Sequence, residues 1–179
     1  MSEKKDVYAE AKSQMRLSER IVAAIPGFRG YKEKELRRES DKLIRNHLHS
    51  RLSETKGDLK AVFQKLSDRR YFDVITDMDR LMAKVDRIEE KVNHASYGYS
   101  GFFDVIKVTE ENLDRMIDFD NKLVSEAEGL GADVDAFKAE IAKGETKNAK
   151  EKIQNIADKI EAFEKTFDKR AEVILGGVT

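Results

Sequence analysis

The sequence predicts an all-α protein, an elongated antiparallel bundle of four to five helices in which long helices pack as in a coiled coil. Three observations lead to this fold. Apolar residues recur at steps of three and four in five separate stretches, which is the spacing of one face of a helix. Charged residues make up 39% of the 179 residues, and the chain has one proline. No stretch shows the alternation of apolar and polar residues that is typical of a half-buried strand.

We expect a single helical domain over residues 1–179. Its parts are a basic N-terminal helical half (1–96), an aromatic and glycine-rich connection (97–108) and a C-terminal helical half (109–179). The sequence contains no run of about 18 apolar residues and no apolar signal-peptide core at its start, so we expect a cytoplasmic protein. The chain has no cysteine, which excludes disulfides and thiolate metal sites.

The net charge of −1 conceals an uneven distribution. Residues 29–70 contain 13 basic and 7 acidic side chains, a net charge of +6, whereas residues 71–141 contain 8 and 17, a net charge of −9. Such regions either pair with each other inside the fold or attract a charged partner. We expect internal pairing.

The first predicted helix spans residues 6–25. Pro26 and Gly27 stop it, because proline cannot continue the backbone ladder and glycine permits a turn. Three apolar residues around this turn are expected to cover one end of the bundle: Ile25, Phe28 and Tyr31. The alternative is an anion contact through Arg29 and the backbone N–H groups at the start of the next helix.

The second predicted helix spans residues 31–66, with a regular seam from its middle onwards: Leu52, Thr55, Leu59, Val62 and Leu66. Gly57 lies inside this run, so a break there, with Asp58 as a new cap, is an alternative to one continuous helix. The candidates for binding an anionic surface precede this seam: Arg29, Lys32, Lys34, Arg37, Arg38 and Arg45. Their charges suit the phosphates of a nucleic acid or a membrane surface, although acidic residues are interleaved with them.

The seam changes phase after Leu66, which predicts a third helix capped near Ser67 or Asp68, or else a kink in one long helix. The apolar positions of this third segment are Phe72, Ile75, Met78, Met82, Val85, Ile88 or Glu89, and Val92. Their spacing is close to the heptad of helical bundles and coiled coils.

A fourth predicted helix begins after Thr109, a suitable N-cap residue with acids following it. We expect Gly129 and Gly131 to end this helix and Asp133 to cap a short further segment. Asp120 is the exception on its apolar seam. We expect its carboxylate to meet a basic group of the second helix or a tyrosine hydroxyl.

The final predicted helix, residues 147–175, has the cleanest seam in the chain: Ile153, Ile156, Ile160, Phe163, Phe167, Ala171 and Ile174. Successive phenylalanines on that seam predict a core element.

Residue patterns of common catalytic and metal sites are missing from the sequence. There is no paired Glu-x-x-His motif of a di-iron bundle, no Gly-x-Ser-x-Gly and no phosphate-binding glycine loop. His47 and His49 are two residues apart and so lie on different faces of a helix. We therefore predict no enzymatic activity, no cofactor and no metal site.

The connection at residues 97–108 is the best candidate for a specific site. Four of the 14 aromatic residues fall within seven positions there: Tyr97, Tyr99, Phe102 and Phe103. Either these rings cover the end of the bundle, or some are exposed and bind a partner, since glycine allows close backbone approach and tyrosine adds a hydroxyl to an apolar ring. Tyr99, between Gly98 and Gly101, is expected to be the most exposed.

These features predict a non-catalytic helical scaffold or adaptor that binds another protein or itself, with no small-molecule substrate implied. The alternative is peripheral binding to a membrane surface or a nucleic acid through residues 29–70.

Overall fold

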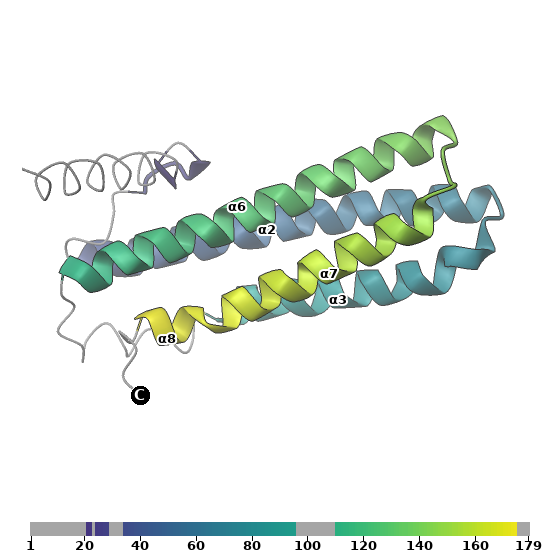
Figure 1. Cartoon of the computed structure of the whole chain (residues 1–179). Helices are drawn as coiled ribbons and strands as arrows, with labels where there is room; N and C mark the ends of the chain where they lie inside the picture. Colours follow the sequence, from purple (N-terminus) through teal and green to yellow (C-terminus); the bar gives the residue numbers. More distant parts are fainter. Residues whose placement is uncertain (1–20, 23, 29–33, 96–109, 175–179) are drawn as a thin grey trace, which may run out of the picture.

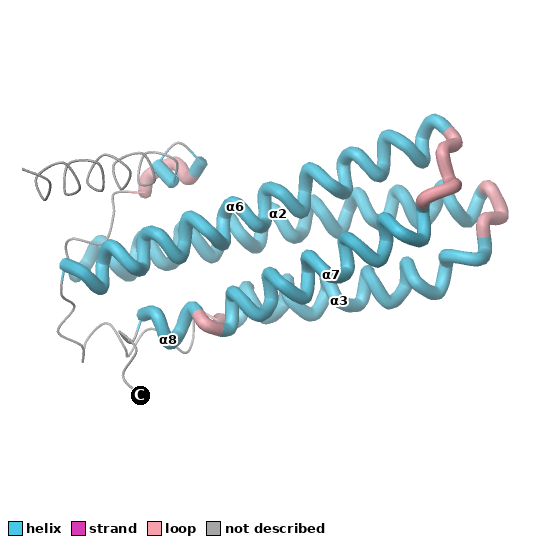
Figure 2. Tube along the Cα trace, viewed as in Figure 1, coloured by secondary structure: helices cyan, strands magenta, loops and turns pink. Residues whose placement is uncertain are grey.

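The computed structural model is an elongated bundle of four long helices (Figure 1). It describes residues 21–22, 24–28, 34–95 and 110–174. The helices are α2 (Lys34–Asp68), α3 (Ile75–His94), α6 (Glu110–Lys143), α7 (Ala149–Asp168) and the short α8 (Arg170–Ile174). All regular elements in the described residues are helical, and short loops join them within each half (Figure 2), so the predicted all-α bundle is confirmed.

Two helical hairpins build the bundle. The first joins α2 to α3 through the 3-10 turn η1 (Phe72–Val74), and the second joins α6 to α7. Helix α2 contacts α3 and α6, and α7 contacts α3 and α6, so α3 and α6 stand at diagonal corners. Helices are antiparallel within each hairpin. Between the hairpins, α2 runs parallel to α6 and α3 runs parallel to α7 (Figure 1).

Both long helices end in the same turn at the hairpin tips. The N–H of Tyr71 donates to the carbonyl five residues earlier, and the N–H of Glu145 does the same at the end of α6. This bond closes a helix through one residue in the left-handed conformation, which is usually glycine. Gly144 occupies that position after α6 with φ of 90°, but Arg70 occupies it after α2 with φ of 58°. Because of its Cβ, Arg70 is strained where a glycine would not be.

The buried apolar positions of the second hairpin follow those of the first at a constant distance of 75 residues. In eleven pairs at this distance both members are buried and apolar: Leu48 and Leu123, Leu52 and Ala127, Leu59 and Val134, Val62 and Phe137, Leu66 and Ile141, Val74 and Ala149, Met78 and Ile153, Leu81 and Ile156, Val85 and Ile160, Ile88 and Phe163, Val92 and Phe167. The two hairpins therefore share most of their pattern of buried apolar positions.

The predicted end of the fourth helix at Gly129 and Gly131 is wrong, because α6 continues through both glycines to Lys143. Leu130 and Val134 are buried on the same face, and this packing outweighs the weak helix propensity of glycine, about 1 kcal/mol per residue. Helix α2 likewise continues through Gly57.

Two further predictions are corrected near helix ends. Phe72 does not belong to the seam of α3, because it lies in η1 before that helix, and 65% of its surface is exposed. The final helix is not continuous, since α7 ends at Asp168 and α8 begins at Arg170. Of the two alternatives after Leu66, the structure shows a break, because α2 ends at Asp68. The predicted cap at Ser67 or Asp68 is wrong, because both residues lie in α2 and Val74 precedes α3.

The residues that precede α2 add to one side of the core. Ile21, Ile25 and Phe28 are buried, and the N–H of Ile25 donates to the carbonyl of Ile21. Gly27 then has φ of 87°, a backbone conformation that side chains rarely adopt. The predicted stop at Pro26 and Gly27 is therefore confirmed, whereas Tyr31 lies outside the described residues.

Candidate functional site

The aromatic candidates Tyr97, Tyr99, Phe102 and Phe103 lie outside the described residues. The helices that flank them are described. Helix α3 ends at His94 at the same end of the bundle at which α6 begins at Glu110 (Figure 1). The connection between α3 and α6 therefore starts and finishes at this end of the bundle.

Most of the basic candidates are also outside the side chains that the structure describes. Arg29 and Lys32 precede α2, and Lys34, Arg37 and Arg38 stand in its first turns, where only the backbone is described. Arg45 is described, and it is only 8% exposed. Its guanidinium is held inside the bundle by Asp41, so we no longer count Arg45 among the surface candidates.

A layer of buried charge crosses the bundle at the end where α2 and α6 begin. It consists of Asp41 and Arg45 on α2, Asp120 on α6 and Arg170 at the start of α8, and we call these four residues the ion layer. Their exposed fractions are 3%, 8%, 2% and 1%. Two guanidinium groups face two carboxylates, so the formal charges of the layer cancel.

Arg170 is the centre of the ion layer. Its Nε and Nη2 donate to the two carboxylate oxygens of Asp120, at 2.7 and 3.1 Å, in the forked geometry that suits a guanidinium. Its Nη1 donates to Oδ1 of Asp41 at 2.5 Å. The other oxygen of Asp41 accepts from Nε of Arg45 at 2.9 Å. Arg170 thus joins the C-terminal end of the second hairpin to both α6 and α2.

The local sequence explains how these side chains meet. Asp41 and Arg45 are four residues apart on one helix, so they share a face. Asp120 lies on the apolar seam of α6, as the sequence analysis noted. The basic group that the structure shows beside it is Arg170, because the break at Lys169 starts a new helix there. The expected partner was a basic group of the second helix or a tyrosine hydroxyl.

Asp41 and Arg170 were missed, although the sequence contains a signal for both. Counting back from the buried Leu52 and Leu48 by alternating steps of four and three reaches the charged residues at positions 45 and 41. A step of three from Phe167 reaches Arg170. A charged residue at a seam position is the pattern that would have identified the layer.

Ion pairs between helices line the sides of the bundle. On α3, Lys84 pairs with Glu161 of α7, and Lys91 pairs with Glu164 at 3.3 Å. The hydrogen bond from Lys84 lowers the pKa of Glu161. Lys56 of α2 donates hydrogen bonds to Asp86 and Glu89 of α3, and these bonds, the one to Asp86 most of all, raise the pKa of Lys56 above its usual range. Of these pairs, those of Lys56 join the basic residues 29–70 to the acidic residues 71–141, as the expected internal pairing requires.

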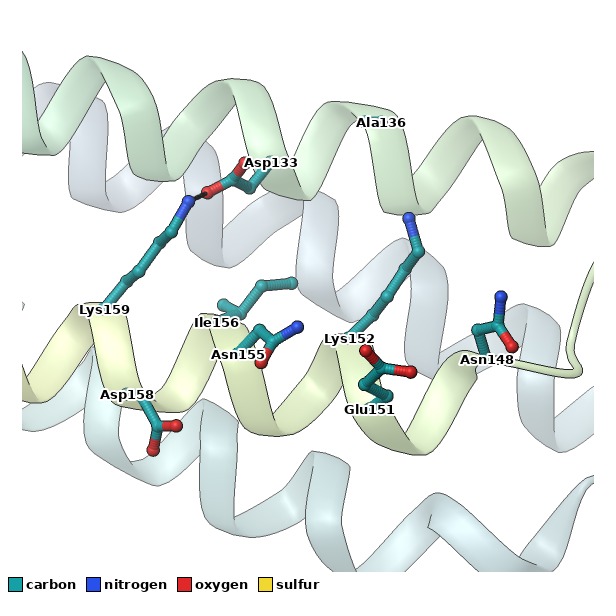
Figure 3. Close-up of a pocket in the computed structure, with 9 residues that line it drawn as sticks. All are labelled: Asp133, Ala136, Asn148, Glu151, Lys152, Asn155, Ile156, Asp158 and Lys159. Atoms are coloured by element: carbon teal, nitrogen blue, oxygen red, sulfur yellow. Dashed lines mark hydrogen bonds and ion pairs between the residues drawn. The ribbon is translucent and has the colours of Figure 1, made fainter.

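An open groove of about 460 Å³ lies between α6 and α7 (Figure 3). Lys152 and Lys159 reach across it from α7 toward α6. Lys152 donates to Glu140 at 2.6 Å, and Lys159 pairs with Asp133. Acids of the facing helix therefore hold both lysines of the groove.

Within the described residues, no three histidine, cysteine or acidic side chains are placed to hold a metal ion. None of the described helices is long and apolar enough to cross a membrane. No protein-family model matches the chain, and neither the curated proteins nor the solved structures contain a significant match to it.

Proposed function

We propose that the protein is a non-catalytic helical scaffold or adaptor, and that it binds another protein through the end of the bundle that contains the ion layer. The topology supports this proposal most directly. Helices α3 and α6 occupy diagonal corners, and residues 96–109 join them at this end. The four clustered aromatic residues of the sequence therefore belong to a connection that links opposite corners of a rigid support. Connections on rigid scaffolds are common recognition sites.

The ion layer supports the same end as a geometrically defined platform. Forked hydrogen bonds between guanidinium and carboxylate groups fix the relative orientation of the helices that carry them. Arg170 does this for α8, α6 and α2 together. A protein partner that approaches this end would meet helix termini held in one arrangement, which lowers the ordering cost of binding.

Binding of a nucleic acid or a membrane surface through residues 29–70 has less support. Arg51 pairs with Glu54 and with Glu128, and Lys56 pairs with Asp86 and Glu89. Because these two cations already face acids, such binding would depend on the other basic residues of this stretch, among which Lys42, Lys60 and Arg70 are exposed. Liposome flotation and an RNA shift assay at two salt concentrations test this alternative, since phosphate contacts weaken with salt.

Affinity capture from cell extract with two matched aromatic variants tests the proposal. Tyr99→Ala should keep the helical signal and melting temperature but lose the captured partner. Phe72→Ala removes an exposed ring at the opposite end of the bundle and should lose nothing. The proposal fails if Phe72→Ala abolishes capture. It also fails if Tyr99→Ala unfolds the protein while the remaining folded molecules still bind.

A further inference from the structure

The ion layer is a place where the two hairpins differ in charge and size. At the 75-residue distance, Asp41 of the first hairpin corresponds to the buried Met116 of the second, and the basic Arg45 corresponds to the acidic Asp120. Ala95 of the first corresponds to Arg170 of the second. In the eleven core pairs described above, both members are apolar. Most of the buried positions therefore do not distinguish the first hairpin from the second.

We propose that the contact between Asp41 and Arg170 determines which hairpins pair, so that the first hairpin packs on the second instead of on a copy of itself. In the native arrangement the short side chain of Asp41 accepts a hydrogen bond from the long side chain of Arg170 at 2.5 Å. The corresponding positions, Met116 of the second hairpin and Ala95 of the first, are also one long and one short side chain. The contact between Asp41 and Arg170 is therefore complementary in volume and in charge.

Pairing of identical hairpins would break this complementarity. Two first hairpins would set Asp41 against Ala95, which leaves a space where the Arg170 guanidinium now lies. They would also place a second Arg45 where Asp120 now lies, so that the forked guanidinium–carboxylate contact is lost. Two second hairpins would set Arg170 against Met116, which crowds two long side chains and places a guanidinium nitrogen against a thioether. Removing a partner from a buried charged group, leaving a cavity and overpacking are each unfavourable.

Buried polar residues have this effect in other helical assemblies. A single polar residue in an apolar seam specifies register and oligomeric state in coiled coils, because wrong pairings leave it without a partner. Specificity is a difference between two free energies, so a contact can select a partner even when it adds little stability. This inference is independent of the protein partner proposed above.

The test is to cleave the connection between the two hairpins and measure which hairpins reassociate. A protease site inserted within residues 96–109 allows the full-length protein to be folded first and cut afterwards. The cut protein is incubated in moderate urea so that the hairpins dissociate, and it is then returned to buffer. The masses of the complexes that form are measured by native mass spectrometry. The two hairpins differ in mass, so mixed and identical pairs are counted separately.

The cut wild type should re-form mixed pairs almost exclusively. In an apolar-layer variant (Asp41→Met, Arg45→Leu, Asp120→Leu and Arg170→Ala), the ratio of mixed to identical pairs should fall by about tenfold or more, which corresponds to about 1.4 kcal/mol. Asp41→Asn preserves the volume and should lower the ratio in the same direction. This milder variant decides the question if the fourfold variant does not fold.

Lys138→Gln is the matched control, because Lys138 pairs across the hairpins with Asp58 at a partly exposed position. It should leave the ratio unchanged. The proposal is overturned if the ion-layer variants keep the wild-type ratio, if the cut wild type forms identical pairs as readily, or if Lys138→Gln lowers the ratio equally.

Discussion

Replacing Arg170 with methionine should lower the free energy of unfolding by about 3–5 kcal/mol, the usual cost of removing one partner from a buried ion pair. The methionine fills part of the space but offers no donor. Asp120, 2% exposed, loses two hydrogen bonds, and Asp41, 3% exposed, loses one. Asp41 would keep its contact with Arg45, whereas Asp120 would lose the forked contact with Arg170. A loss of this size is a large fraction of the roughly 5–15 kcal/mol that stabilises an ordinary domain.

Urea unfolding followed by circular dichroism measures this effect. With a slope of about 2 kcal/mol per molar urea, the midpoint should fall by about 1.5–2.5 M. Arg80→Met is the control, because the Arg80 side chain is 74% exposed and faces Asp77 at 3.7 Å, so its loss should cost less than about 0.5 kcal/mol. A midpoint shift below about 0.5 M for Arg170→Met, or an equal shift in the control, would show that the ion layer does not hold the bundle end together.

Three further changes have expected outcomes of their own. Arg70→Gly should raise the free energy of unfolding by about 1 kcal/mol, because φ of 58° strains a residue with a Cβ. Arg69→Gly should lower the free energy of unfolding, because it removes hydrogen bonds to carbonyls at the end of α6. Urea midpoints test both changes. Gly129→Ala should raise the melting temperature, since about 1 kcal/mol of helix propensity is gained in open space. Lys84→Gln should raise the pKa of Glu161 toward its ordinary value, as followed by NMR titration.

The controls for these changes come from neighbouring residues. Gly131→Ala should gain less than Gly129→Ala, because its Cβ would lie 2.9 Å from Nη2 of Arg51 and displace that side chain. For the titration, a lowered pKa of Glu161 means that the Lys84 pair stabilises the fold at neutral pH and stops doing so as the pH falls through that pKa. The stabilities of Lys84→Gln and wild type should therefore converge in acid. Divergence in acid would contradict the assignment.

The fold could be predicted because it depends on spacing alone. Leu59, Val62 and Leu66 recur at steps of three and four and are all fully buried, and Phe163 and Phe167 are buried with their rings stacked at 6.4 Å. Periodicity of this kind reports which face of a helix is covered. It does not report what covers it, so the parallel arrangement of α2 and α6 could not be read from the sequence.

Helix ends and the ion layer were harder to predict for a different reason. Glycine propensity suggested an end at Gly129, but the packing of Leu130 and its neighbours on α6 has the larger effect. Arg170 and Asp41 are 129 positions apart and carry charges that usually mark a solvated face. Only the three-dimensional pairing of the hairpins brings them together, and the constant distance of 75 residues became evident once burial was known.

Comparing the stabilities of two ion-layer variants distinguishes the net contribution of the layer to folding from the cost of removing only one of its charges. Arg170→Met leaves buried carboxylates with fewer donors, so it should be strongly destabilising. Replacing all four charged residues with apolar ones leaves no charge behind, and such replacements are often neutral or stabilising. Because eleven pairs of buried apolar residues remain, we expect the bundle to fold without the layer. If the fourfold variant is as stable as the wild type but sorts its hairpins poorly, the layer selects the pairing and does not supply the stability. If it is much less stable, the ion layer stabilises the bundle beyond what apolar packing provides, and selection is not needed to explain it.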